Sequence, residues 1–159
     1  MIDWSAASDL DRVDEHRRSP EWVAQLWRSP EAKLLKLDGN SRFTTNTGGS
    51  KLRLVKPFVE YDSQRHRLLG LLGDAPIFAV EALTEGEVHD FREVAHQLTD
   101  TERDIAATAT AMINWHRGEP HCPRCGSPTR VINGGYARHC PVCDTELFPR
   151  TDPAVIVAI

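Results

Sequence analysis

The sequence has no apolar stretch that approaches the ~20 residues needed to cross a bilayer. Its opening segment, MIDWSAASDLDRVDEHRR, is polar and acidic, whereas a secretory signal peptide is basic and then apolar. An excess of positive charge is also lacking, because 19 Lys and Arg stand against 23 Asp and Glu, and this argues against a global attraction to nucleic acid. These absences predict a cytoplasmic protein with no membrane partner. In that compartment paired cysteines more often bind metal than form disulfides.

The composition is that of a globular protein. Hydrophobic residues make up 40% of the 159 residues, and at a net charge of −4 this excludes collagen-like, low-complexity and wholly disordered chains. The length fits one ordinary domain or two small ones.

The first 83 residues predict one helix followed by a sheet. Ser19-Pro20-Glu21 predicts a helix over 20–27 whose tryptophan-bearing face packs against the domain, with an aromatic ligand box as the alternative, and Ser29-Pro30-Glu31 is a second helix-start signal. Short β-rich runs then predict a mostly antiparallel sheet of about five strands. The runs are KLLKLD, SRFTTN, KLRLVKPF, RHRLLGLL and PIFAVEA. Asp38-Gly39 and Gly73-Asp74 are predicted hairpin turns, because glycine adopts the positive φ that such turns need.

Residues 84–118 are predicted to be helical. Residues 84–98 predict a weak helix, and the Thr99-x-x-Glu102 capping box predicts a strong one that ends at Gly118. The apolar residues of the second helix and His116 recur at helical spacing, which favours a core face over a cofactor surface.

Four cysteines form the most informative pattern in the chain. Cys122-x2-Cys125 and Cys140-x2-Cys143 are separated by 14 intervening residues, and two such turns present four thiolates to one tetrahedral Zn²⁺. Gly126 permits the first turn, and a hairpin through Gly134-Gly135 joins the two pairs as in a zinc ribbon.

The predicted zinc is structural, because four thiolates leave no open position for a catalytic water. A thioredoxin-like redox pair needs only one C-x2-C, and a double disulfide needs an oxidising compartment. His121 and His139 neighbour the cysteines and are alternative ligands.

Zinc ribbons often bind nucleic acid, which makes the local charge relevant. Between residues 121 and 150, four arginines (Arg124, Arg130, Arg138 and Arg150) stand against Asp144 and Glu146. This slight basic bias, without lysines or an array of aromatics, permits nucleic-acid binding but does not require it.

A family resemblance rests on residues 84–159. Trp115-His116-Arg117, the two C-x2-C turns and the segment LFPRTDPAVIV from Leu147 resemble NADH pyrophosphatases of the Nudix hydrolase superfamily. The resemblance implies a β-rich N-terminal domain, a structural zinc ribbon and a following catalytic domain. It also implies hydrolysis of NAD(H) to nicotinamide mononucleotide and AMP, removal of NAD caps from RNA, and a homodimer.

The catalytic signature of that superfamily, G-x5-E-x7-R-E-U-x-E-E-x-G-U, is absent from the chain. Its glutamates hold the Mg²⁺ or Mn²⁺ with which water attacks a pyrophosphate. The nearest match, Arg92-Glu93-Val94, has His96 and Gln97 where the paired glutamates should stand. We therefore expect Mg²⁺ or Mn²⁺ and all catalytic residues to belong to a domain outside this chain.

Two residues match substrate contacts of the resembling family. Phe148 occupies the aromatic position just after the ribbon, which stacks on substrate, and its alternative role is a plug between the ribbon and the next domain. Arg92 aligns with a substrate-contacting arginine, and its alternative is a surface ion pair.

The predicted organisation has three parts. Residues 1–117 form an N-terminal α+β domain, residues 118–152 a zinc ribbon, and residues 153–159 the first strand of a truncated Nudix domain. The apolar run PAVIVAI predicts the strand. An unpaired apolar strand would invite aggregation, which predicts that a further domain begins at about residue 153; the alternative is a strand that inserts into the preceding sheet. The leading hypothesis is the N-terminal part of an NADH pyrophosphatase that is inactive alone. The alternatives are a non-enzymatic ribbon that binds nucleic acid or a protein, and a chain that serves only in dimerisation.

Overall fold

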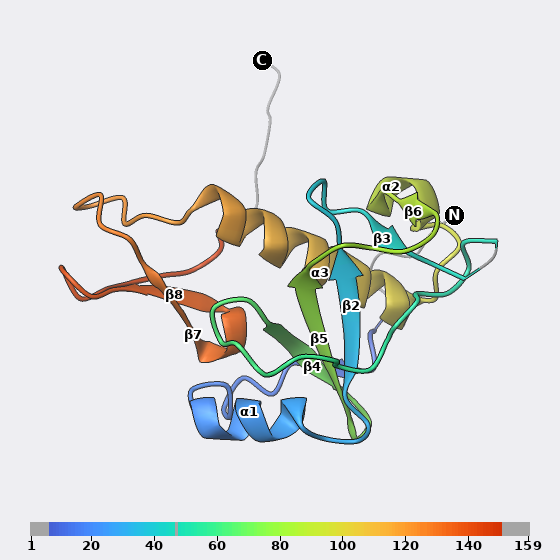
Figure 1. Ribbon diagram of the computed structural model, residues 1–159, viewed down its shortest axis with the longest axis horizontal. Coiled ribbons are helices and arrows are strands. Elements are labelled where there is room, and N and C mark those ends of the chain that lie inside the picture. Colours follow the sequence, from blue (N-terminus) through green and yellow to red (C-terminus); the bar gives the residue numbers. More distant parts are fainter. Residues whose placement is uncertain (1–6, 47, 151–159) are drawn as a thin grey trace, which may run out of the picture.

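The computed structural model describes residues 7–46 and 48–150, which form a six-stranded sheet, a three-stranded sheet and the helices packed on them (Figure 1). The strand order of the larger sheet is β1-β4-β5-β2-β3-β6. In that order the strands span Leu10–Asp11, Arg67–Leu72, Ala75–Glu81, Lys33–Leu37, Phe43–Thr44 and Val88–His89. Neighbouring strands are antiparallel except β2 and β5, which run parallel. The predicted α+β class is confirmed.

One predicted strand of this sheet is wrong. KLRLVKPF, residues 51–58, forms no strand and pairs with the sheet through isolated bridges. Val55 exchanges two backbone hydrogen bonds with Leu34, at 2.7 and 3.0 Å, on the edge of β2 that the two-residue β3 leaves uncovered. Pro57 follows shortly after and has no N–H to extend the ladder.

Both predicted hairpin turns form, but only one uses its glycine. Gly73, with φ of +58°, joins β4 to β5. Between β2 and β3 the positive φ of +62° belongs to Ser41, and Gly39 does not have one. The Asp38 carboxylate closes this turn by accepting backbone hydrogen bonds from Asn40 and Arg42, at 2.8 and 2.9 Å.

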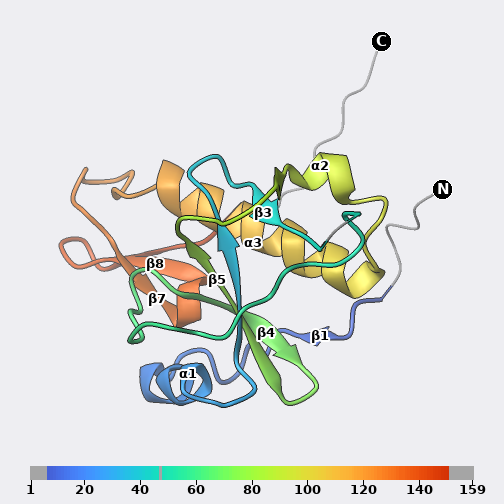
Figure 2. The ribbon, with the colours of Figure 1, turned by 45° about the vertical axis from the view of Figure 1, so that its right-hand side comes forward.

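Different helices cover the two faces of the larger sheet (Figures 1 and 2). Helix α3, Asp100–Gly118, packs on the face that presents Leu35 and Ile77, and helix α1, Pro20–Trp27, packs on the face that presents Leu34 and Phe78. Burial of each such side chain stabilises the fold by roughly 1.5–3 kcal/mol. The predicted core role of the α3 stripe is confirmed. Its buried members are Ile105, Ala106, Ala109, Met112, Ile113 and His116.

Helix α1 begins as its sequence predicts. The Ser19 hydroxyl accepts the backbone N–H of Trp22 at 3.2 Å, and Pro20 is the first helical residue. Trp27 is buried, stacks on His66 with ring centroids 4.0 Å apart, and donates its indole N–H to the carbonyl of Val59. The aromatic face therefore packs into the core.

The second helix-start signal is wrong, since Pro30 lies in a turn. The N–H of Ala32 bonds the carbonyl of Ser29 at 3.1 Å, and β2 begins one residue later. Too few residues separate α1 from β2 for another helix.

Only a short part of residues 84–98 is helical. Helix α2 spans Phe91–Val94, and a reciprocal capping box between Asp90 and Glu93 starts it. At the start of α3 the Thr99 hydroxyl accepts the Glu102 N–H, as predicted, while the Glu102 carboxylate accepts the N–H of Leu52 at 3.1 Å. None of the helices in the described ranges has the length and apolar character needed to span a membrane.

The three-stranded sheet forms the predicted ribbon. Its strands, in order, are β7 (Arg130–Ile132), β8 (Ala137–Cys140) and β9 (Thr145–Leu147), and all pairs are antiparallel. A single 3₁₀ turn, η1 (Asn133–Gly135), joins β7 to β8. The predicted strand over residues 153–159 lies outside the described residues, and the boundaries at 117 and 152 stay predictions.

Two polar contacts hold the ribbon against the larger sheet. The side-chain amide of Gln64 donates to the carbonyl of Val131 at 3.1 Å and accepts its N–H at 2.9 Å, as a neighbouring strand would. The guanidinium of Arg17 stacks on the Tyr136 ring, 3.8 Å from its centroid, and donates to two carbonyls of β4.

A third contact fixes the ribbon to α3 through His116. The ring Nε2 lies 2.6 Å from the carbonyl oxygen of Gly135, and the ring Nδ1 lies 3.0 Å from a guanidinium nitrogen of Arg138. A carbonyl only accepts and a guanidinium only donates, so the ring is neutral with its proton on Nε2. Burial and the positive charge of Arg67 lower the pKa of His116 to about 3, which keeps it neutral.

A substitution at Gly135 tests the close packing between the ribbon and Arg67. The φ of Gly135 is +107°, and a β-carbon there would lie 2.6 Å from Cδ of Arg67. We expect Gly135→Ala to lower the free energy of unfolding by at least about 2 kcal/mol through clash and strain. The control is Gly118→Ala, where no atom lies within 4 Å of the added carbon, and which should change stability by less than about 1 kcal/mol. Urea unfolding of both variants measures the difference, and equal stabilities would contradict the prediction.

The neutral His116 predicts a dependence of stability on pH. Its pKa is about 3 in the folded chain and about 6.5 when unfolded, so its contribution is complete above pH 6.5 and is lost as the pH falls toward 3. At pH 5 the loss amounts to at most about 2 kcal/mol.

His116→Gln removes this titration while its amide can still donate to one partner and accept from the other. We therefore expect unfolding free energies of this variant to fall less between pH 7 and pH 5 than those of the unaltered chain. Both proteins carry the same thiols, so any acid release of metal is common to them. Identical pH profiles would refute the assignment.

Candidate functional site

Two similar turns present the four cysteines. In the first, the Gly126 N–H bonds the carbonyl of Cys122 at 2.8 Å, and in the second the Asp144 N–H bonds the carbonyl of Cys140 at 3.0 Å. Gly126 and Asp144 have φ of +72° and +53°, so both turns end in the left-handed region. The glycine at position 126 predicts this left-handed conformation from the sequence, whereas the aspartate at position 144 does not.

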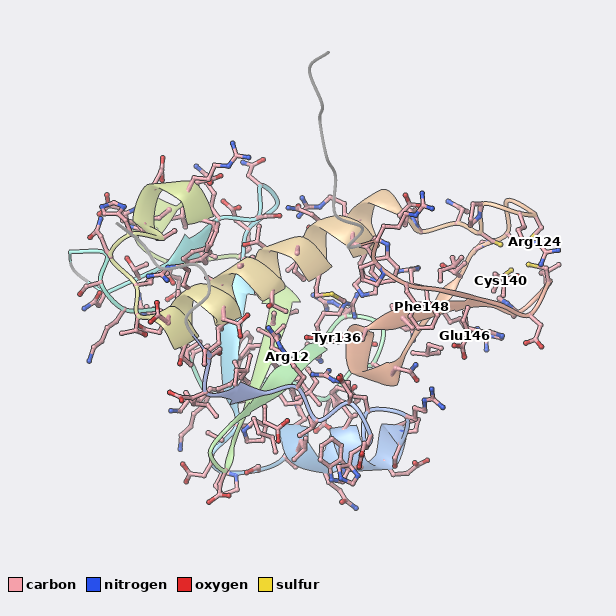
Figure 3. All side chains as sticks on the ribbon, turned by 180° about the vertical axis from the view of Figure 1, so that it is seen from behind. Arg12, Arg124, Tyr136, Cys140, Glu146 and Phe148 are labelled. Carbon is pink, nitrogen blue, oxygen red and sulfur yellow. The ribbon has the colours of Figure 1, made fainter. Side chains whose placement is uncertain are left out.

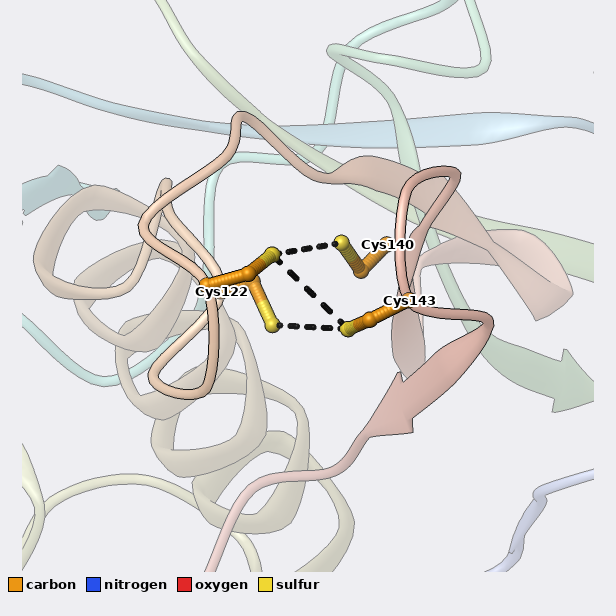
Figure 4. A group of neighbouring side chains, drawn as sticks. Cys122, Cys140 and Cys143 are labelled. Carbon is orange, nitrogen blue, oxygen red and sulfur yellow. Dashed lines mark hydrogen bonds between the residues drawn. The ribbon is translucent and has the colours of Figure 1, made fainter.

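The thiols of the two turns face one another across a small gap (Figure 4). Sγ of Cys122 lies 3.5 Å from Sγ of Cys143, and Sγ of Cys125 lies 3.5 and 3.8 Å from those of Cys140 and Cys143. A tetrahedron with Zn–S bonds of about 2.3 Å places its sulfurs about 3.8 Å apart. The four sulfurs lie within 4.8 Å of one another, so the cluster has the dimensions of a tetrathiolate zinc site.

The surroundings of two thiols favour the charged form that binds metal. Hydrogen bonds from Ser127 lower the pKa of Cys125 to about 6, and the hydroxyl of Thr145, 3.2 Å from Sγ of Cys143, lowers the pKa of that thiol. Cys122 and Cys140 are buried beneath them. The backbone N–H of Cys143 lowers the pKa of Cys140, but burial and the hydrogen bonds with the Cys125 and Cys143 side chains outweigh it and raise that pKa to about 11. Zinc binds thiolates, so the environments of Cys125 and Cys143 suit a metal centre.

The two neighbouring histidines stand outside the cluster. The ring Nε2 of His139 lies 2.8 Å from a carboxylate oxygen of Asp144, and His121 joins Pro128 through a backbone bridge. Within residues 7–46 and 48–150, the four cysteines are the only group of three or more side chains of ligating type close enough to share a metal ion.

Phe148 follows β9 and lines a pocket on the surface of the molecule. Its side chain is 58% exposed, and the cavity of about 590 Å³ lies between the N-terminal segment, α3 and the ribbon. Figure 3 shows Arg12, Tyr136 and Phe148 along this side of the molecule, where Arg12 donates to the Tyr136 hydroxyl at 3.0 Å. Pockets of ~300–1,000 Å³ accommodate organic ligands.

Arg92 lies elsewhere. It is an exposed residue of α2, where its backbone N–H bonds the carboxylate of Asp90, and it is not among the residues that line the Phe148 pocket. The structure therefore does not bring Arg92 and Phe148 together in that pocket. Conversely, sequence reasoning missed Arg12 and Arg17, because no motif or spacing links residues of the N-terminal segment to Tyr136.

The ribbon has a recognisable type. Residues 119–148 match the family model of the NADH pyrophosphatase zinc ribbon domain. The resemblance to NADH pyrophosphatases is thereby confirmed. Together, this match and the clustered thiols support a structural zinc in the ribbon.

Similarity to curated proteins extends beyond the ribbon. The NAD-capped RNA hydrolase NudC of Mycobacterium tuberculosis is 29% identical over 158 residues, which cover 94% of this chain and 50% of that protein. NudC of Deinococcus radiodurans is 35% identical over 95 residues, 57% of this chain and 34% of its own. Human NUDT12, also an NAD-capped RNA hydrolase, is 32% identical over 100 residues, 55% of this chain and 22% of its own. The chain spans about half the length of its mycobacterial relatives.

The metal centre gives a direct prediction. We expect elemental analysis of protein purified without chelator to find one zinc per chain, and Cys140→Ala to lose it together with ribbon stability, because metal binding is coupled to folding in such small units. The matched controls are His121→Ala and His139→Ala, which should retain the zinc. Zinc-free native protein, or loss of zinc in a histidine variant alone, would contradict the four-thiol site.

Proposed function

We propose that this chain is the N-terminal and zinc-ribbon portion of an enzyme that hydrolyses NAD(H) to nicotinamide mononucleotide and AMP and removes NAD caps from RNA. The observation that carries the proposal is the ribbon, whose sequence matches that of NADH pyrophosphatases and whose sulfurs have the spacing of a zinc tetrahedron. Relatives that align with 94%, 57% and 55% of the chain are NAD-capped RNA hydrolases, which supports the same reaction.

The ribbon zinc has a structural role in this proposal. Cys122, Cys125, Cys140 and Cys143 are its ligands, and four thiolates leave no position for a reacting water. The metal would hold the two cysteine turns together, and with them β8, which leads into the second turn, and β9, which follows it. It would thereby fix the direction in which the chain leaves β9 toward Phe148.

Catalysis is assigned to residues outside this chain. The sequence lacks the Nudix signature, and the part of the chain that the structure describes contains no cluster of carboxylates able to share a metal ion. Mg²⁺ or Mn²⁺ would accordingly be bound by a catalytic domain that follows. The complete protein would be a cytoplasmic homodimer.

Phe148 and Arg92 are proposed substrate contacts of different kinds. The Phe148 ring is exposed beside a pocket large enough for part of a dinucleotide, which suits stacking on a planar ring. Arg92 lies on α2, apart from that pocket, so its contact would be with another part of the substrate.

The alternative, a stand-alone nucleic-acid-binding ribbon, receives no added support from the fold. Arg138 is buried and bonds Thr129 and His116, so it adds no charge to the ribbon surface. The exposed arginines are then Arg124, Arg130 and Arg150, against the exposed Asp144 and Glu146. Salt-dependent binding of this chain to uncapped RNA would favour the alternative.

An activity assay tests where catalysis resides. We expect the isolated chain to release no nicotinamide mononucleotide from NADH with Mg²⁺ or Mn²⁺, while the mycobacterial relative, assayed alongside, does so. Turnover by the isolated chain would overturn the assignment. The coding sequence beyond Ile159 tests the rest, because a Nudix signature within about 100 residues supports the proposal and a stop codon contradicts it.

A further inference from the structure

A buried cationic group lies where the larger sheet meets α3 and the ribbon. Arg67 of β4 and Arg138 of β8 are 5% and 7% exposed, and no ion pair joins either of them to a carboxylate in the described ranges. Arg138 is satisfied by Thr129 and by His116, which is neutral. Arg67 is the exception that requires an explanation.

The guanidinium of Arg67 has fewer partners than donors. One Nη donates to the carbonyl of Gln64 at 2.8 Å and the other reaches the carbonyl of Ser63 only at 3.5 Å. Its Nε is buried and has no hydrogen-bond partner. Buried cations in proteins are normally paired and hydrogen-bonded, since leaving one without partners is costly. Burial and the charge of Arg138 also lower the pKa of Arg67 to about 10.

Arg67 lines a pocket together with two further arginines. Arg65 comes from the turn before β4 and Arg117 from the last turn of α3. Arg117 is paired with Glu81 at 2.7 Å, whereas the guanidinium of Arg65 has no hydrogen bond or ion pair with the described residues. Three guanidinium groups and one carboxylate leave the pocket strongly positive.

The size of the pocket selects the kind of ligand. Its volume of about 190 Å³ is several times the ~30 Å³ share of one water and lies below the ~300–1,000 Å³ of pockets that enclose organic ligands. A compact oxyanion fits these limits and a dinucleotide does not. One guanidinium group can donate two parallel hydrogen bonds to two oxygens of a phosphate, and this makes arginine a common residue in phosphate sites.

We propose that this pocket binds a phosphate-sized oxyanion through the guanidinium groups of Arg65, Arg67 and Arg117. The ligand would supply negative charge beside Arg67, which has no ion pair in the described ranges. Because Arg67 also packs directly beneath Gly135, a bound anion would stabilise the seat of the ribbon on β4 and α3. This site is separate from the zinc cluster and from the Phe148 pocket, and it does not depend on the proposed enzymatic function.

The test is a titration of the purified chain with inorganic phosphate, followed by calorimetry and by thermal unfolding at constant ionic strength. We expect saturable binding and a saturating rise in the melting temperature. Arg65→Gln should weaken binding about tenfold, since one charge-assisted contact is lost. Arg28→Gln is the matched control, because it removes the same charge at the end of α1, on the other face of the sheet, and should bind phosphate as the unaltered chain does.

Phosphate also strengthens folding generally by exclusion from protein surfaces, and such an effect grows without saturation and does not depend on Arg65. A response of that form, or no difference between Arg65→Gln and Arg28→Gln, would overturn the proposal.

Arg67→Lys keeps the positive charge but loses the planar guanidinium that can donate two parallel hydrogen bonds. Once near-ultraviolet circular dichroism has shown that its structure is native, this variant should bind phosphate at least tenfold more weakly. AMP titrated in parallel separates the sources of the phosphoryl group. Equal or weaker binding than phosphate supports a free ion, and tighter binding that Arg65→Gln abolishes assigns the site to a nucleotide and overturns the size argument.

Discussion

The seat of the ribbon on α3 depends on one neutral imidazole. His116 donates to the carbonyl of Gly135 and accepts from Arg138, so it satisfies a buried backbone oxygen and a buried cation with one side chain. A protonated ring could not accept from Arg138 and would add a charge to a region that already holds Arg67. Together with the contacts of Gln64 and Arg17, this contact holds the end of the ribbon near η1 against the larger sheet and α3.

The zinc cluster and the sheet contacts stabilise different parts of the ribbon. The thiols join the two cysteine turns, which lie away from α3, while Gln64, Arg17 and His116 secure the end near η1. A unit this small buries little apolar surface, so it needs such links in place of a core. Loss of the metal would consequently loosen the cysteine turns before it affects the larger sheet, which has its own core on both faces.

Sequence patterns predicted the features that depend on neighbours along the chain. The Ser19 and Thr99 caps, the α3 stripe and the two C-x2-C turns are local, and all are present. Predictions failed where a tertiary contact competed with a local signal. Pro30 lies in a turn because β2 starts soon after it, and residues 51–58 form bridges instead of a strand because only one stretch of the β2 edge is free.

The sequence by itself determined the α+β class, the metal-binding chemistry and the family resemblance, since each is written in residue types at short, fixed spacings. Only the tertiary structure decided that Phe148 and Arg92 lie apart, that Arg138 is interior rather than available to a partner, and that Arg117 lines one pocket with Arg65 and Arg67 from a distant part of the sequence. The physical reason is that burial and charge pairing depend on which elements pack together. Arginines look alike in a sequence, and their neighbours in space separate a buried structural cation such as Arg138 from a candidate anion ligand such as Arg65.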